Sequence, residues 1–312
     1  HQIEKTSGPV RKVVIVGGGP AGMEAARVCA ERGHDVTLFE ARDELGGQIT
    51  IAAKAPQRDQ IAGITRWYQL ELARLKVDLR LGTRADEATI RDLRGDVVIL
   101  AVGGRPFMDQ FASWGYDEDP AKSLIVSSWD VLDGRVVPGS NVLIYDSICE
   151  FSGVSVADYL ADKGARVEIV TDDIKPGAAV GGTTFPTYYR SLYAKEVVMT
   201  SDMVLHEVYR EGEGLVAVLE NEYTGTLEER VVDQIVVENG VRPDEALYYA
   251  FKDGSLNKGQ IDVESLYAIK PQPCLSQATE GNDYLLFRLG DCNAPRNTHA
   301  AIYDALRLCK DF

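Results

Sequence analysis

Short runs of apolar residues alternate with longer segments rich in alanine and leucine along most of the chain. The run Val13–Val16 is the clearest, and similar runs lie in DVTLFE, DVVILAV, NVLIYD, RVEIV and YLLFRL. Continuous apolar runs indicate strands that are buried on both faces of a parallel sheet, and the segments between them indicate covering helices. The pattern therefore predicts an α/β fold.

Glycines follow the first strand with the spacing G-x-G-x-x-G, at Gly17, Gly19 and Gly22. In such a turn the first glycine permits a tight bend, the second lets a pyrophosphate approach the backbone, and the third lets the helix pack closely on the sheet. The next strand ends at Glu40, which is placed to accept hydrogen bonds from an adenosine ribose. Because strand, glycines, helix and acid follow in order, we predict a site for the ADP moiety shared by FAD and NAD(P).

Two further segments favour FAD over NAD. A loop containing Gly46 and Gly47 is able to pass over a nucleotide. Near the end of the chain, an apolar run leads to Gly290 and Asp291 and then to a helix from about Thr298. Gly290 allows close approach, Asp291 is able to bind ribityl or ribose hydroxyls, and the helix directs its positive end at the phosphates.

These patterns define a set of candidate cofactor contacts and no catalytic or metal-binding residue. His299 lies where a flavin ring or pyrophosphate is expected, although a helix-capping or surface position is equally consistent with the sequence. The sequence has no trusted Ser-His-Asp arrangement, H-E-x-x-H motif or Walker A loop. The predicted contacts are Gly17, Gly19, Pro20, Ala21, Gly22, Glu40, Ala41, Arg42, Gly47, Gln48, Gly103, Gly290, Asp291 and His299.

A second segment, beginning SNVLIYDSICEF, repeats the strand-turn-helix-strand outline without glycines in its turn. We expect the three glycine positions to correspond to Asp146, Ile148 and Phe151. The larger side chains would fill the space that a pyrophosphate needs, and the carboxylate would repel phosphates. Asp172 and Asp173 after the next strand disfavour a 2′-phosphate as well. The sequence thus predicts a degenerate site that binds no NAD(P)H.

Two segments, Asp96–Pro106 and Val236–Leu247, look like the crossovers that join the FAD and NAD(P) domains of two-dinucleotide flavoproteins. We therefore predict two Rossmann-like domains, of which the first is discontinuous and the second has the degenerate site. The FAD/ADP-binding domain is expected at 1–130 plus 271–312, and the degenerate NAD(P)-like domain at 131–270.

The charge and the cysteine spacing narrow the range of partners and of cysteine-based sites that we expect. A formal net charge of -15 argues against a nucleic-acid or anionic-membrane partner. The 5 cysteines form no C-x-x-C pair, so the usual spacing of a redox disulfide or a cysteine-ligated cluster is missing. No run of about 18 apolar residues occurs, and we expect a cytoplasmic protein.

The chain begins HQIEKTSGPVRK without Met, so Met removal, an added leading His and a piece of a longer polypeptide all stay open.

The residues VVIVGGGPAGMEAARV, LGGQ, the degenerate YDSICEF and the terminal GDCNAPRNTHAAIYDALRLCKDF resemble the C-terminal half of the trimethylamine-dehydrogenase-like flavoproteins. Within them, the chain is most similar to bacterial demethylases of dimethylglycine and N-methylproline, over essentially its whole length. The resemblance implies FAD or ADP in this chain, and FMN and a four-iron cluster on an N-terminal barrel domain or subunit outside it. It also implies oxidative amine demethylation, transfer of electrons to an electron-transferring flavoprotein, and an oligomeric protein.

Two other functions stay open at this point. The first is a free-standing FAD-dependent NAD(P)H oxidoreductase of the disulfide-reductase class, against which the absent C-x-x-C and second glycine motif both count. The second is a non-catalytic module in which a bound ADP is structural and the surfaces serve assembly.

Overall fold

The computed structural model describes residues 2–268, 270–279 and 281–310, so positions 1, 269, 280, 311 and 312 of the predicted domains lie outside the described residues. The chain divides into two compact units. The first comprises His1–Thr50, Ile61–Arg105 and Val241–Phe312, and the second comprises Ile51–Gln60 and Pro106–Gly240.

The first unit is built on a parallel five-stranded sheet in the order β15-β4-β1-β2-β3. Its strands are β1 (Lys12–Val16), β2 (Asp35–Phe39), β3 (Asp78–Arg80), β4 (Val97–Leu100) and β15 (Leu285–Arg288). Strand β15 comes from the C-terminal part of the chain and pairs with β4, with Leu285 opposite Val97. The first Rossmann-like domain is therefore discontinuous, as predicted.

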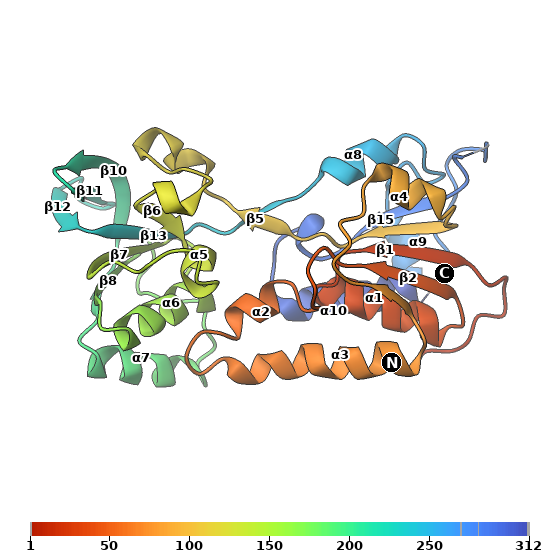
Figure 1. The fold of residues 1–312 in the computed structure, drawn as a ribbon, viewed down its shortest axis with the longest axis horizontal. Helices are drawn as coiled ribbons and strands as arrows, with labels where there is room; N and C mark the ends of the chain where they lie inside the picture. The colour runs from red at the N-terminus through yellow and green to blue at the C-terminus, as the bar shows by residue number, and fades with distance from the viewer. Residues whose placement is uncertain (1, 269, 280, 311–312) are drawn as a thin grey trace. The chain divides into compact units, whose positions relative to one another are not determined.

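Helices cover both faces of this sheet (Figure 1). Val13 and Ile15 of β1 belong to the core that contains residues of α1, α3 and α10, whereas Val14 and Val16 face the core that contains residues of α4 and α8. Burial on both faces explains why the apolar runs are continuous. The helices are α1 (Pro20–Glu31), α3 (Ala62–Arg74), α4 (Glu87–Asp92), α8 (Ala246–Lys252), α9 (Val263–Ala268) and α10 (Thr298–Cys309).

The second unit repeats the parallel sheet but covers it differently. The sheet, in the order β6-β13-β7-β8-β9, has helices on one face and a three-stranded antiparallel sheet, β10-β11-β12, on the other. Its parallel strands are β6 (Ile125–Ser127), β7 (Asn141–Asp146), β8 (Arg166–Val170), β9 (Val198–Thr200) and β13 (Gln234–Glu238). The antiparallel strands are β10 (Met203–Glu211), β11 (Gly214–Asn221) and β12 (Leu227–Val232), and the helices are α5 (Ser128–Leu132), α6 (Phe151–Asp162) and α7 (Phe185–Ala194).

The remaining elements are short. They are α2 (Gln48–Ala52), the two-stranded sheet of β5 (Gly104–Pro106) and β14 (Val241–Pro243), and the 3-10 helices η1 (Asp59–Ile61), η2 (Asp109–Trp114), η3 (Pro120–Lys122) and η4 (Gly290–Cys292). In the described parts of the chain, no helix has both the length and the apolar character that crossing a membrane requires.

The observed boundaries differ from the predicted 130/131 and 270/271, because the chain changes units near β5 and β14. Phe111 packs in the core of the second unit, so the segment after residue 105 belongs there. Tyr248 and Phe251 of α8 pack in the core of the first unit, which places the segment from Val241 onward in that unit. Ile51 and Ala55 pack in the second unit.

Candidate nucleotide-binding site

The turn after β1 requires glycine at its first position. Gly17 has φ +107, a backbone conformation that other residues rarely adopt. A Cβ atom at Gly17 would lie 2.2 Å from the carbonyl oxygen of Ala101, which is backbone and therefore unable to move aside. The N–H of Gly17 donates to the carbonyl of Phe39, with 2.8 Å between nitrogen and oxygen. The turn is thus packed against the ends of two neighbouring strands.

Gly22 brings helix α1 close to this turn. A Cβ atom there would lie 1.8 Å from the carbonyl oxygen of Gly17. Gly19 precedes the helix with φ −73 and ψ −178, and a Cβ built on it meets no described atom within 4 Å. Pro20 is the first helical residue, and no side chain among the described residues caps α1. The positive end of α1 therefore faces open space in front of Gly19, which suits a phosphate.

Glu40 follows β2 and is fixed by the turn itself. Its Oε2 accepts a hydrogen bond from the N–H of Gly18 at 2.7 Å, and its Oε1 accepts one from the N–H of Arg42 at 2.8 Å. Each carboxylate oxygen keeps a second lone pair, so the side chain is still able to accept from ribose hydroxyls. Ala41 and Arg42 are exposed beside it, and the guanidinium of Arg42 donates to the hydroxyl of Thr50 at 3.4 Å.

The loop after Glu40 lies on the glycine turn. The N–H of Gly46 donates to the carbonyl of Gly18 at 2.9 Å. Gly47 has φ +54, and a Cβ there would lie 3.1 Å from the Cα atom of Gly19. The loop predicted to pass over a nucleotide therefore touches the turn predicted to hold its pyrophosphate.

Residues far apart in the sequence meet at the other side of the turn. The side-chain amide of Gln48 donates to Oδ2 of Asp291 at 2.7 Å, and the N–H of Arg296 donates to Oδ1 at 3.3 Å. Gly290 has φ +64, and a Cβ there would lie 2.9 Å from the Cβ of Ala21. A Cβ on Gly103 would lie 4.0 Å from Nε2 of Gln48. These predicted contacts are thus brought together around the start of α1.

His299 is placed differently from the other candidates. It is the second residue of α10, it is exposed, and its ring stacks on Tyr303 with the centroids 6.1 Å apart. The N-terminus of α10 already has a cap, because the side chain of Asn297 accepts from the N–H of Ala300 at 2.9 Å. The ring contact of His299 therefore lies along its own helix and not at the glycine turn.

Two residues that support this site were not predicted. Gly18 holds Glu40, and a Cβ on it would lie 2.4 Å from Cδ2 of Leu45. Its only signal in the sequence is the run of three glycines. Arg296 contributes its backbone N–H to Asp291, and no side-chain pattern reveals such a contact.

The turn of the second unit differs from the predicted alignment. Asn141 pairs with Arg166 as Lys12 pairs with Asp35, so Asp146 stands where Gly17 stands. Helix α6 begins five residues after Asp146 and α1 begins three residues after Gly17, so the second turn is two residues longer. Counted from the helix, Glu150 stands where Gly19 stands in the first unit. The strand register confirms Asp146 as the equivalent of Gly17, because Val16 pairs with Phe39 and Tyr145 pairs with Val170 in the two sheets. The helix side of the predicted alignment was wrong by two residues, because Glu150 and Gly153, and not Ile148 and Phe151, stand at the positions of Gly19 and Gly22.

The second turn nevertheless keeps one glycine. Gly153 is the third residue of α6, as Gly22 is of α1, and a Cβ on it would lie 2.0 Å from Oδ2 of Asp146. Close approach of helix and strand is therefore preserved. The residue before the helix is the exposed Glu150, whose carboxylate repels phosphate at the position where the first unit has Gly19.

Burial changes the acidity of two carboxyl groups beside this second turn. Burial raises the pKa of Asp146 to about 6 and the pKa of Glu238 to about 7. The two lie opposite each other on β7 and β13. An environment that disfavours negative charge so strongly is unsuited to a pyrophosphate.

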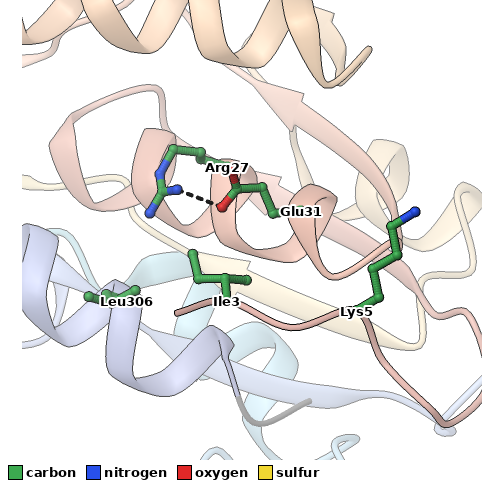
Figure 2. Close-up of a pocket in the computed structure, with 5 residues that line it drawn as sticks. All are labelled: Ile3, Lys5, Arg27, Glu31 and Leu306. Atoms are coloured by element: carbon green, nitrogen blue, oxygen red, sulfur yellow. Dashed lines mark hydrogen bonds and ion pairs between the residues drawn. The ribbon is translucent and has the colours of Figure 1, made fainter. Parts of the chain in front are cut away.

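A cavity on the first unit lies apart from this site. A surface cavity of about 510 Å³ on the first unit is lined by Ile3, Lys5, Arg27, Glu31 and Leu306 (Figure 2). It lies at the last turns of α1, where Arg27 already pairs with Glu31 at 2.8 Å, and away from Gly19. Within the described ranges, no group of three or more His, Cys, Asp or Glu side chains is arranged to hold a metal ion.

Comparisons with known proteins agree with this geometry. Residues 12–91 match the family described as FAD dependent oxidoreductase. The chain is 78% identical over its full length to 45% of an N,N-dimethylglycine/sarcosine dehydrogenase from Chromohalobacter salexigens. It is 41% identical, over 96% of its length, to 43% of a probable N-methylproline demethylase from Rhizobium meliloti. The chain thus spans less than half the length of these curated relatives, and the resemblance predicted from its sequence is confirmed.

A solved structure supports the fold. A complex of 2-naphthoyl-CoA reductase matches with a TM-score of 0.77 and 23% identity, over 100% of this chain and 41% of the other. At this sequence identity, the match is evidence for the fold and not for the function. Together, the comparisons place the chain among the homologues of flavin-dependent oxidoreductases, with a Rossmann-type α/β architecture.

Proposed function

We propose, from the premise that the chain is homologous to part of bacterial flavin-dependent demethylases, that it is the FAD- or ADP-binding half of an oxidative amine demethylase. The observation that carries this proposal is the first strand-to-helix turn. It combines open space at Gly19, an uncapped helix behind it, and Glu40 fixed beside it.

The residues present fit an adenine dinucleotide. The pyrophosphate would lie at the N-terminus of α1, where Gly19 leaves room for it. Glu40 would accept from the adenosine ribose, and Asp291 would accept from the ribityl chain if the ligand is FAD. When bound, FAD supplies a two-electron redox centre. The protein holds and orients it, and Gly47 and Gln48 shield one side of the site.

We assign the oxidation of the amine to a separate domain or subunit. The relatives extend well beyond this chain, and its sequence predicts no catalytic residue at the candidate site. The resemblance implies a barrel with FMN and a four-iron cluster, and an electron-transferring flavoprotein as acceptor. The identity of 78% to an N,N-dimethylglycine/sarcosine dehydrogenase points to N-methylated glycines as substrates.

The test is a set of calorimetric titrations of the nucleotide-free protein with FAD, ADP and NADPH. We expect one site per chain for FAD or ADP, and no heat of binding for NADPH. Steady turnover of NADPH with a dye acceptor would instead support a free-standing NAD(P)H oxidoreductase and overturn the proposal.

The substrate is tested separately with the full-length protein. N,N-dimethylglycine and sarcosine should reduce an artificial electron acceptor, and each turnover should remove one N-methyl group. If neither amine reduces the acceptor while another N-methyl compound does, the assignment of N-methylated glycines is wrong but the nucleotide site stands.

A structural ADP is the second candidate. Gln48 already donates to Asp291 at 2.7 Å, so the oxygen expected to meet a ribityl chain has a protein partner. ADP has no ribityl chain and leaves this hydrogen bond undisturbed. Affinity for FAD that equals the affinity for ADP would favour this alternative.

A further inference from the structure

Two acidic side chains lie next to each other inside the second unit. Asp146 is the last residue of β7, Glu238 is the last residue of β13, and the two are partners in the parallel register. Adjacent strands are about 4.8 Å apart, and residues in register point to the same face. Asp146 is 0% exposed and Glu238 is 6% exposed. Two carboxyl groups thus share one dry environment, in which two negative charges are unfavourable.

The hydrogen bonds of Asp146 leave one oxygen without a partner. Its Oδ1 accepts from the N–H of Cys149 at 2.9 Å and from the N–H of Ile148 at 3.2 Å. Its Oδ2 has no hydrogen-bond partner among the described residues, and it points at α6, where a Cβ on Gly153 would lie 2.0 Å away. Burial without a hydrogen-bond partner destabilises an ionised oxygen by its full desolvation free energy. Protonation removes the negative charge and most of this cost.

Glu238 has one polar side-chain partner and acidic neighbours. The hydroxyl of Ser128, in α5, donates to its Oε2. Asp146 and Glu150 act on it electrostatically, and Asp172 and Glu150 act on Asp146 in the same way. Asp146 also affects the pKa of two other groups, the thiol of Cys149 and the hydroxyl of Tyr145. Neither group supplies a positive charge that would stabilise an ionised carboxylate. The named neighbours therefore favour the protonated form of the pair, in line with the raised pKa of both groups.

We propose that Asp146 and Glu238 form a proton-binding pair that holds the second turn closed while it carries a proton, and that loss of this proton to solvent opens the turn. The segment next to the pair that we expect to open most easily is the turn Ser147–Glu150. Cys149 has φ +55, which is unfavourable for a residue with a side chain, and Ile148 is already 40% exposed. Opening the segment Ser147–Glu150 would let water reach Asp146 and relieve the repulsion.

This inference goes beyond the proposed function, since it concerns the unit that has lost its nucleotide site. In the first unit, the phosphates of the proposed nucleotide would complete the turn. In the second, the carboxyl of Asp146 takes the backbone N–H groups of Ile148 and Cys149 for itself. A proton is thus the ligand to which the second turn responds.

Hydrogen exchange of the purified full-length chain tests the proposal. Exchange of the peptide that covers Ser147–Gly153 is measured by mass spectrometry from about pH 5 to about pH 8.5 and corrected for the intrinsic pH dependence of exchange. We expect its protection to fall by about tenfold or more over this range in the wild type. Glu238→Gln should reduce the fall in protection with pH, because an amide keeps the Ser128 hydrogen bond and removes one of the two titrating groups, while Asp146 still titrates.

Glu150→Gln is the matched control. It removes an exposed carboxylate from the same turn, and it should retain the pH dependence of the wild type. Protection that does not change with pH in the wild type would overturn the proposal, as would an unchanged pH dependence in Glu238→Gln.

A measurement on the wild type alone covers the case in which a variant does not fold. Infrared spectra in heavy water should contain the C=O stretch of a buried carboxylic acid near pH 6, which disappears as the pH rises to about 8.5. Absence of such a band near pH 6 would contradict the proton-binding pair.

Discussion

The two strand-to-helix turns of this protein solve the same packing problem with different atoms. In the first, Gly22 lies against the backbone carbonyl of Gly17, where a Cβ would come within 1.8 Å. In the second, Gly153 lies against a side-chain oxygen of Asp146, where a Cβ would come within 2.0 Å. The close approach of helix and strand is kept in both units. What differs is that the first turn leaves space for the proposed nucleotide, whereas the carboxyl of Asp146 accepts from the backbone N–H groups of the second turn.

The residue before each helix decides this difference. Gly19 opens onto space in the first unit, and Glu150 places a carboxylate at the same position in the second. A scaffold is therefore able to lose a phosphate site while it keeps the glycine on which its packing depends.

Gly22→Ala should damage the first unit most. Its new Cβ meets backbone that has no freedom to move, so we expect a loss of roughly 4 kcal/mol or failure to fold. Urea unfolding measures the change. Gly19→Ala is the matched control, because its Cβ meets no described atom within 4 Å and its φ of −73 suits alanine. A loss for Gly19→Ala as large as for Gly22→Ala would contradict the packing described.

Gly153→Ala should destabilise the second unit by roughly 3 kcal/mol, and removal of the opposing side chain should rescue part of this loss. The closest atoms are Oδ2 and Cγ of Asp146, at 2.0 and 2.4 Å, and Asp146→Ala removes both while the Cβ of residue 146, at 2.8 Å, stays. A double-mutant cycle by urea unfolding should give a coupling energy of about 1 to 2 kcal/mol. Simple additivity would mean that the two residues do not oppose each other.

Glu238→Gln should gain stability relative to the wild type as the pH rises. The folded-state pKa of Glu238 is raised from 4.5 to about 7, so the folded state binds more protons than the unfolded state between these values. The wild type therefore loses about 3 kcal/mol of stability relative to Glu238→Gln between about pH 4.5 and about pH 7, and the difference stays level above that. Chemical unfolding of both proteins at several pH values measures this difference in stability. If the advantage of Glu238→Gln shrank as the pH rose, the predicted direction would be wrong.

Asp291→Ala should distinguish the two candidate ligands with the smallest energetic effect. If Asp291 meets the ribityl chain, affinity for FAD should fall about tenfold, or about 1.4 kcal/mol, while affinity for ADP is nearly unchanged. Calorimetric titration gives both constants. Gln48→Ala is the companion variant, because it removes the hydrogen bond to Asp291 without removing the carboxylate. Equal losses for FAD and ADP would exclude a ribityl contact.

The fold and the first turn follow from the sequence because local rules determine them. The apolar runs correspond to buried strands, and the distances at Gly17 and Gly22 agree with the two packing roles that glycine spacing assigns to them. The binding roles of Gly19 and Glu40 stay predictions, supported by the open space and the fixed carboxylate.

Other features depend on contacts that no local pattern encodes. Gln48 and Asp291 meet across 243 positions, and two inserted residues in the second turn shifted the helix side of its alignment. The boundaries between units depend on where Phe111 and Tyr248 pack, and the apolar pattern is the same for either core. The paired acids at Asp146 and Glu238 become visible only when the order of the strands is known.

The central claim is that the first turn holds an adenine nucleotide and the second does not. Its most direct test is to denature the purified protein, identify the released nucleotide by absorbance and mass, and count it per chain. We predict one FAD or ADP per chain in the wild type, its loss in Gly19→Val, and its retention in Glu150→Val, the equivalent position of the second unit. Retention in Gly19→Val together with loss in Glu150→Val would contradict the account.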